Sequence, residues 1–142
     1  PYFYIELSES TGFPSLLASS SREINNSMPK NTANEILSIL SEEENPKVLI
    51  LGYSYKANVG DTRETPVNPL AFHLKEGGCD VLIHDPLVKI GDLPTWAEGV
   101  SEPKKCNDLD LIILATFHEE YNYSMEEKTK KAYRHDTIQD KK

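Results

Sequence analysis

The chain has 142 residues, of which 38% are hydrophobic and 27% charged, and this composition is typical of a folded domain. Lys and Arg number 15 against 23 Asp and Glu, so the net charge of −8 disfavours binding to nucleic-acid phosphates and to anionic membranes. No apolar run approaches the roughly 20 residues that span a bilayer, and two cysteines do not make a disulfide framework. We therefore expect a cytoplasmic protein that binds neither nucleic acid nor membranes.

Residues 1–44 are predicted to form a helical connector. Apolar residues from Leu16 to Met28 recur at approximately helical spacing. Pro29 has no backbone N–H to donate and restricts the residue before it. We therefore expect Pro29 to interrupt the helix and a second helix to run from about residue 30 to residue 42. The apolar stripe of this second helix would comprise Ile36, Leu37 and Leu40.

Residues 45–142 alternate between strand and helix patterns. Three continuous apolar runs are typical of buried parallel strands: residues 48–52, 80–86 and 109–116. A helix starting near Pro66 or Pro69 and ending at residues 77–78 would join the first two strands in a right-handed crossover. Its core-facing side chains would be Leu70, Phe72 and Leu74. The alternation predicts an α/β class, namely a Rossmann-like, three-layer domain with a parallel sheet.

The remaining segments of the domain lack a regular pattern. Residues 87–108 contain several prolines and glycines, so we expect loops with short helices there. Beyond about residue 128 the chain is charged and has no apolar strand. A poorly ordered tail is the expectation for that end of the domain.

The segment after the first strand is the first place to look for a ligand site, because ligands of such sheets bind beyond the carboxyl ends of the strands. It lacks the G-x-G-x-x-G pattern and forms a long loop between strand and helix, residues 53–65. Lys56 and Arg63 could bind an anionic ligand, and Tyr55 could pack against a ring. The alternative is a solvated loop in which Arg63 pairs with a neighbouring carboxylate, Asp61 or Glu64.

Three segments resemble one enzyme family. The sequence GYSYKANVGDTRETP at residues 52–66 resembles the G-x-x-[FY]-K-x-[ND]-x-x-D-x-R-[ED]-[ST]-P signature of nucleotide-sugar 6-dehydrogenases. HDPLV at residues 84–88 resembles the Y-D-P-x-V of that family. REINNSMP at residues 22–29 resembles its A-R-x-I-N-D-S-M-P segment, most typical of the UDP-N-acetylmannosamine branch, with Asn26 in place of the usual acid. The resemblance extends from residue 1 to about residue 123.

The resemblance implies a role in the NAD-dependent oxidation of a UDP-sugar C6 alcohol to a carboxylate. By matched position, Tyr55 and Lys56 would contact the UDP-sugar, and Arg63 would contact NAD held mainly by another domain. The cysteine nucleophile of the family lies in a G-G-x-C-x-x-x-D-P-Y segment whose end matches residues 1–2. We therefore expect the nucleophile and the NAD-binding domain upstream of this chain, and no catalytic residue within it. The C-terminal V-[FY]-D-G-R motif of the family has no counterpart here, so Arg134 is assigned no role.

Other candidate sites are set aside. Cys106 is flanked by lysines, which could lower the pKa of a thiol, but it does not match the cysteine of the family. No metal is expected, because His84 and His118 belong to no set of ligands with suitable spacing. Asp85 could bind a ribose at the end of its strand, but a turn before Pro86 is the favoured interpretation.

Two hypotheses about function remain open. In the first, the chain is the fragment of a UDP-sugar 6-dehydrogenase that binds the UDP-sugar. In the second, it is a non-catalytic structural or oligomerisation remnant of that family. Residues 1–44 would expose an apolar stripe in either case, and we expect a homodimer or a larger homo-oligomer.

Overall fold

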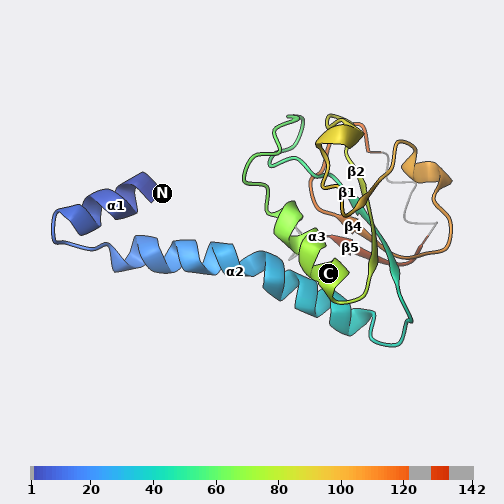
Figure 1. Ribbon diagram of the computed structural model, residues 1–142, viewed down its shortest axis with the longest axis horizontal. Coiled ribbons are helices and arrows are strands. Elements are labelled where there is room, and N and C mark those ends of the chain that lie inside the picture. The colour runs from blue at the N-terminus through green and yellow to red at the C-terminus, as the bar shows by residue number, and fades with distance from the viewer. Residues whose placement is uncertain (1, 122–128, 135–142) are drawn as a thin grey trace, which may run out of the picture.

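The computed structural model describes residues 2–121 and 129–134. Two helices come first, α1 (Tyr2–Ser10) and α2 (Leu16–Ile39), and an α/β domain follows them. In Figure 1, α1 and the first half of α2 extend away from this domain, whereas the second half of α2 lies against it. Most of residues 2–39 is therefore helical, and the second half of α2 belongs to the core of the domain.

The helix α2 continues through Pro29, so the predicted interruption at this proline is wrong. Pro29 removes one backbone hydrogen bond, and α2 changes direction part-way along its length (Figure 1), as helices with an internal proline do. Pro29 is buried, and in the next two turns of the helix Ala33 and Ile36 are completely buried. Tertiary packing of this second half outweighs the local cost of the proline. Ile36 and Leu40 are buried as predicted.

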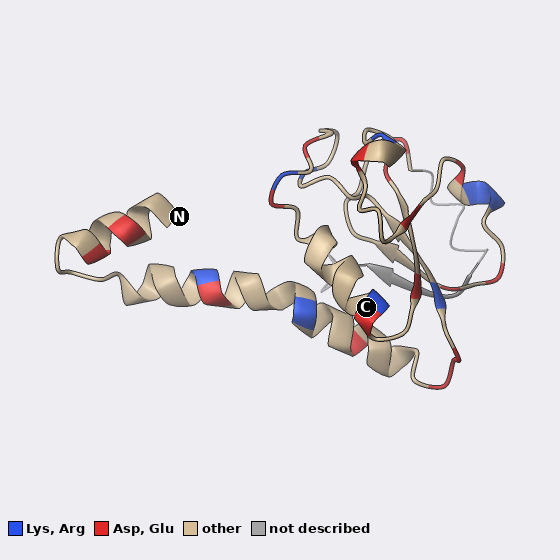
Figure 2. Ribbon diagram, viewed as in Figure 1, with Lys and Arg blue, Asp and Glu red and all other residues tan. Residues whose placement is uncertain are grey.

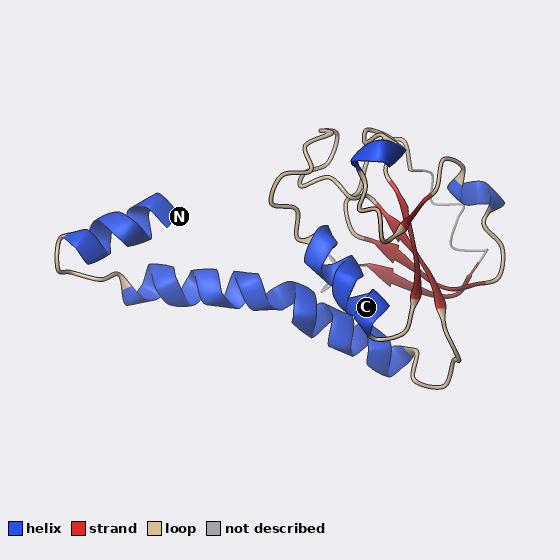
Figure 3. Ribbon diagram, viewed as in Figure 1, coloured by secondary structure: helices blue, strands red, loops and turns tan. Residues whose placement is uncertain are grey.

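The domain is built on a five-stranded sheet in the order β3-β2-β1-β4-β5, and all neighbouring strands run parallel. The strands are β1 (Lys47–Leu51), β2 (Asp80–His84), β3 (Glu98–Gly99), β4 (Leu109–Leu114) and β5 (Thr129–Arg134). The helix α3 (Val67–Glu76) connects β1 to β2, and two short 3-10 helices, η1 (Ile90–Asp92) and η2 (Pro103–Lys105), lie between β2 and β4. The predicted α/β class with a parallel sheet is confirmed (Figure 3).

The strand β5 corrects the expectation that no strand exists beyond residue 128. Residues 129–134 pair with β4 in a parallel register that joins Leu109 to Thr129 and Leu114 to Arg134. The parallel ladder needs only backbone groups, so an edge strand forms here without an apolar run. The expectation of poor order for residues 135–142 lies outside the described residues.

The two α-helices that pack on the sheet, α2 and α3, cover the same face. Their buried side chains, such as Ile36 and Leu74, form one cluster with alternate residues of β1, β2 and β4, such as Ile50. The opposite face carries a second cluster around Leu49, onto which residues of the segment near η2 and of the segment after β4 pack. Phe72 is 44% exposed, contrary to prediction, and makes an edge contact with the ring of Trp96 instead of entering the core.

Gly52 marks the point where β1 ends and the ligand loop begins. Its φ of +88° lies in the left-handed region, and a Cβ there would collide with the backbone of Thr116, which follows β4. The chain can therefore leave β1 directly beside β4 only with glycine at this position. Because β1 lies between β2 and β4, the loops after β1 and β4 meet where the strand order changes direction.

Candidate functional site

The candidate site is the loop at residues 53–66, which runs from β1 to α3 at the carboxyl edge of the sheet. In doubly wound sheets this edge, at the change of direction in the strand order, is where ligands bind. The first residues of the loop, Tyr53 and Ser54, are buried, whereas Tyr55 and Lys56 are exposed. The loop therefore has a buried anchor followed directly by an exposed tip.

Asp85, directly after β2, holds this anchor. Its Oδ2 accepts hydrogen bonds from the backbone N–H groups of Tyr53 (2.7 Å) and Ser54 (2.8 Å) and from the Ser54 hydroxyl (2.9 Å). Its Oδ1 accepts the N–H of Leu87 at 2.9 Å, which forms the predicted turn around Pro86. One buried carboxylate thus joins the loop after β1 to the turn after β2.

His118, in the loop after β4, completes the anchor. Its Nδ1 accepts the backbone N–H of Asn58 at 3.0 Å, so in the neutral ring the proton lies on Nε2. That Nε2 lies 3.0 Å from both Asp85 Oδ2 and Ser54 Oγ. His118 is fully buried and therefore clamps the loop after β1 at two points, the anchor and Asn58. Ser54 is also fully buried and its hydroxyl bonds to Asp85, so this trio is a structural clamp and not an accessible nucleophile.

Further hydrogen bonds tie the same two loops together. The Thr116 hydroxyl donates to the Ser54 carbonyl at 2.7 Å, and the Glu119 N–H donates to Asn58 Oδ1 at 3.0 Å. Within the loop, the N–H of Tyr55 donates to the Asp61 carbonyl at 2.7 Å. These bonds fix the backbone on both sides of the exposed tip. The side chains at the tip are therefore attached to an ordered backbone.

Burial shifts the pKa values of several groups in this network. Burial alone would raise the pKa of Asp85, but the N–H groups of Ser54, Leu87 and Tyr53 together hold it below its usual range. The charge of Asp85 is therefore retained in the interior. Burial, followed by the charge of Asp85, raises the pKa of Tyr121, whose hydroxyl donates to the His84 carbonyl at 2.8 Å. Burial also lowers the pKa of His84, which stays neutral at pH 7.

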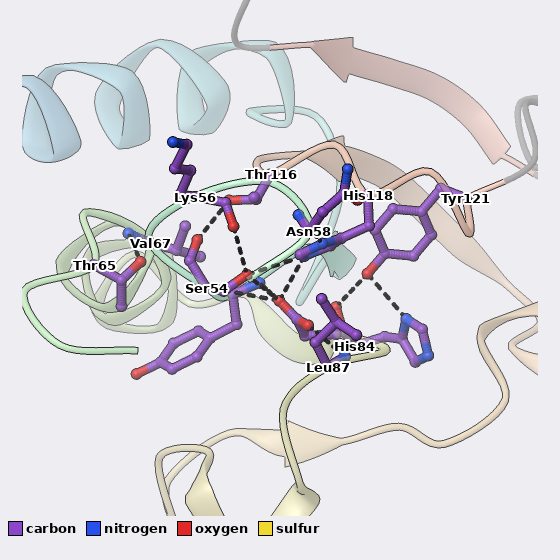
Figure 4. Close-up of polar contacts among 12 residues, drawn as sticks. Ser54, Lys56, Asn58, Thr65, Val67, His84, Leu87, Thr116, His118 and Tyr121 are labelled. Atoms are coloured by element: carbon purple, nitrogen blue, oxygen red, sulfur yellow. Dashed lines mark hydrogen bonds and ion pairs between the residues drawn. The ribbon is translucent and has the colours of Figure 1, made fainter. Parts of the chain in front are cut away.

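The three residues predicted to bind ligands lie in the exposed part of the loop but face different surroundings. Tyr55 is 63% exposed, and the Lys56 side chain points away from the buried network (Figure 4). Arg63 forms a two-pronged ion pair with Asp61, at 2.9 Å from Nε and 2.7 Å from the terminal nitrogen. Arg63 also holds the pKa of Asp61 at about 2. The pairing foreseen in the alternative interpretation is thus present, and Figure 2 shows acidic and basic positions adjoining in this loop.

Two recesses adjoin Tyr55. The smaller one, about 240 Å³, is mainly apolar and lies between α2, α3 and the end of β4, with Thr32, Leu70 and Ala115 in its wall. The larger one, about 720 Å³, lies between α2 and the loop after β1. Tyr55 lines both recesses, whereas Lys56 and Arg63 line neither of them.

Ser54 and His118 help to build the site but were not predicted from the sequence. A serine in a loop and a histidine after a strand carry no pattern of their own. The only available signal was their position directly after neighbouring parallel strands, whose carboxyl ends meet at one edge. Among the described residues, no three side chains of His, Cys, Asp or Glu come together in a group that could hold a metal ion.

The fold and the position of the loop define a doubly wound α/β domain of the kind that binds nucleotides at the carboxyl edge of its sheet. Residues 49–142 match the UDP-binding domain of the UDP-glucose/GDP-mannose dehydrogenase family. The chain belongs to this family, as the resemblance of its motifs indicated.

Individual relatives agree with this assignment. The chain is 33% identical over 132 residues to a UDP-N-acetyl-D-mannosamine dehydrogenase of Methanococcus aeolicus, a match that covers 89% of the chain and 28% of the relative. The structure of the UDP-N-acetyl-mannosamine dehydrogenase of S. aureus superposes with a TM-score of 0.69 at 24% identity, covering 94% of this chain and 35% of that one. A UDP-glucose dehydrogenase of Pyrobaculum islandicum gives a TM-score of 0.70 at 21% identity, covering 92% and 34%.

The last two likenesses are evidence for the fold alone. In these matches the chain spans only about a third of each relative's length. Within residues 2–121 and 129–134, no helix is both long and apolar enough to cross a bilayer.

Proposed function

We propose that this chain supplies the UDP-sugar-binding part of an NAD-dependent UDP-sugar 6-dehydrogenase. The observation that carries the proposal is the exposed pair Tyr55-Lys56, which follows directly on a buried anchor formed by Ser54, Asp85 and His118. An anchored loop lowers the entropy cost of ordering its side chains around a ligand. Membership of the family supports UDP as the nucleotide.

The two side chains suit different parts of a UDP-sugar. Tyr55 offers an exposed aromatic ring that can pack on a planar or apolar ligand surface. Lys56 offers a compact positive charge for a phosphate oxygen. The chain as a whole is acidic, with a net charge of −8, so the affinity for an anionic ligand depends on such local cations.

We assign Arg63 to the NAD side of the same loop. In the structure its guanidinium is bonded to Asp61 and is 88% exposed. An exposed pair of this kind is weak, so a phosphate of the dinucleotide can replace the carboxylate of Asp61. The remainder of the NAD site would be contributed by residues other than those of this domain.

Neither cysteine is placed to act as the nucleophile at this loop. Cys79 directly precedes β2, at the amino edge of the sheet, and burial raises the pKa of its thiol to about 11. Cys106 lines a recess at the same amino edge, together with Lys47 at the start of β1. We therefore propose that oxidation of the sugar uses a nucleophile from outside this chain. We also propose a cytoplasmic location, as the composition of the sequence led us to expect.

Calorimetric titration of the 142-residue chain with UDP tests the binding role. We expect saturable binding that Lys56→Ala weakens by about 10-fold to 100-fold, because a hydrogen bond to a charged group contributes about 1.5–3 kcal/mol. Lys105→Ala is the matched control, since it removes the same charge at the opposite edge of the sheet. No UDP binding by the folded chain, or equal losses in both variants, would contradict the proposal.

A role in assembly has its own support and extends the second hypothesis. Exposed apolar side chains concentrate on α1 and the first half of α2, including Phe3 (78%), Leu16 (76%) and Leu17 (81%). Charged positions are few there (Figure 2). We propose that this surface joins copies of the chain into a homodimer or larger homo-oligomer.

Sedimentation velocity at increasing concentration tests the assembly. We expect Leu17→Glu to shift the chain to the monomer, because the variant places a charge inside the apolar contact. Asn34→Glu adds the same charge to the second half of α2 and should leave assembly unchanged. A wild-type chain that remains monomeric at high concentration would refute this part of the proposal.

A further inference from the structure

The larger recess beside Tyr55 contains an arginine that the site described above does not use. Arg22, in the first half of α2, lines this recess of about 720 Å³. Its Nε is buried and has no hydrogen-bond partner among the described residues. The centre of its guanidinium lies 4.2 Å from the centroid of the Tyr2 ring, which holds the group in place without satisfying its N–H donors.

A buried guanidinium N–H without an acceptor is unfavourable, so the recess favours a ligand that brings one. Glu64 also lines this recess, but among the described residues it forms no ion pair with Arg22 within 4.0 Å. The planar fork of a guanidinium fits the oxygens of a phosphate or carboxylate better than any other common ligand group. An anion in the recess would supply the acceptor that Arg22 lacks.

The rest of the wall suits a nucleotide attached to that anion. Tyr53 and Tyr55 contribute aromatic rings, and Asn25 and Asn68 contribute amides, each with a donor and an acceptor. Aromatic rings can stack on a base, and amides can bond to its edge. The volume lies within the range of 300–1,000 Å³ that is common for small-molecule sites.

We infer that the recess between α2 and the loop after β1 binds a nucleotide through its phosphates, with Arg22 as the principal phosphate ligand. The inference rests on the proposed function and adds α2 to the site. Pro29 and Met28 of this helix line both recesses that adjoin Tyr55, so a ligand there would touch the connector and the domain together.

The test is calorimetric titration of the full 142-residue chain with UDP and, separately, with NAD. We expect Arg22→Gln to weaken binding of one of these ligands at least 10-fold and Arg22→Lys to recover part of the loss, because lysine restores the charge without the fork. Glu23→Gln, at an exposed neighbouring position, is the control and should bind like the wild type. Circular dichroism establishes that each variant is folded.

The outcomes separate this inference from the proposed function. A loss confined to UDP identifies the phosphates as those of the UDP-sugar, and a loss confined to NAD identifies them as those of the dinucleotide. Both results support the inference. If the wild type binds UDP, Lys56→Ala weakens it and Arg22→Gln does not change either ligand, the inference is overturned and the proposed function stands. If Arg22→Gln weakens UDP binding and Lys56→Ala does not, the inference stands and the role of Lys56 fails. Binding of neither ligand overturns both.

Discussion

Replacement of Asp85 by asparagine should destabilise the domain while preserving the size of the side chain. On Oδ2 the carboxylate accepts three hydrogen bonds from Tyr53 and Ser54, and on Oδ1 it accepts one from Leu87. The Nε2 of His118 also lies 3.0 Å from Oδ2. A bond to a charged group contributes about 1 kcal/mol more than a neutral one, so the three bonds on Oδ2 would weaken by about 3 kcal/mol in total. If the new amide NH₂ takes the place of Oδ1, it would face the N–H of Leu87, donor against donor. The lost bond would add about 1 kcal/mol to the destabilisation.

Urea denaturation followed by circular dichroism measures this loss. A loss of about 4 kcal/mol with a slope of about 2 kcal/mol per M lowers the midpoint by about 2 M. Asp80→Asn is the matched control, because Asp80 is exposed at the start of β2 and should cost under about 0.5 kcal/mol. A midpoint shift for Asp85→Asn that is no larger than that of Asp80→Asn would refute the account of the anchor.

The pH dependence provides a second readout of the same carboxylate. Because the pKa of Asp85 is lower in the folded state than in the unfolded state, its stabilising effect is fully present above the unfolded value of about 3.9. It is lost as the pH falls below that value toward the folded pKa. The stability difference between the wild type and Asp85→Asn should therefore shrink between pH 5 and pH 3. A difference that stays constant over this range would show that the charge of Asp85 does not contribute.

Three further predictions concern single positions. Gly52→Ala should prevent folding or lower the melting temperature far more than Gly78→Ala. Both glycines have positive φ, but only a Cβ at position 52 would collide with the backbone of Thr116. Equal losses in melting temperature would contradict this packing argument. His118→Asn keeps an acceptor near the position of Nδ1, whereas His118→Gln keeps a donor near the position of Nε2. The asparagine variant should therefore bind UDP more tightly, because it can still accept the N–H of Asn58. Equal affinities, or tighter binding by the glutamine variant in calorimetry, would contradict the role of this bond. Cys79 should react with iodoacetamide at pH 7.5 only after unfolding, since burial raises the pKa of its thiol to about 11. Peptide mass spectrometry distinguishes Cys79 from the less buried Cys106, and labelling of Cys79 in the native chain would disprove this.

The sequence was sufficient to predict the features that repeat along the chain. The apolar runs of β1, β2 and β4 are continuous, because both faces of these strands are buried. The loop at residues 52–66 was found through its long motif and lies at the predicted edge of the sheet. Gly77 ends α3 and Gly78 adopts a positive φ of +93°, in agreement with the predicted stop.

The errors arose where long-range contacts outweigh local preference. Pro29 disfavours a helix locally, but its segment packs on α3 and on the sheet, and this packing keeps α2 continuous. The strand β5 has no apolar pattern, because its pairing with β4 depends on backbone groups. His118 and Asp85 lie 33 positions apart, and only the meeting of two strand ends brings them within 3.0 Å. Such contacts leave no periodic signal in a single sequence.

The central claim is that a nucleotide binds on the exposed side of the loop after β1. Titration of ¹⁵N-labelled chain with UDP, followed by two-dimensional NMR, tests it most directly, because each backbone amide reports separately. The account predicts shifts for the amides of Tyr55, Lys56 and the nearby residues of α2, with those of the recess around Lys105 unchanged. Shifts concentrated around Lys105, or none at saturating UDP, would contradict it.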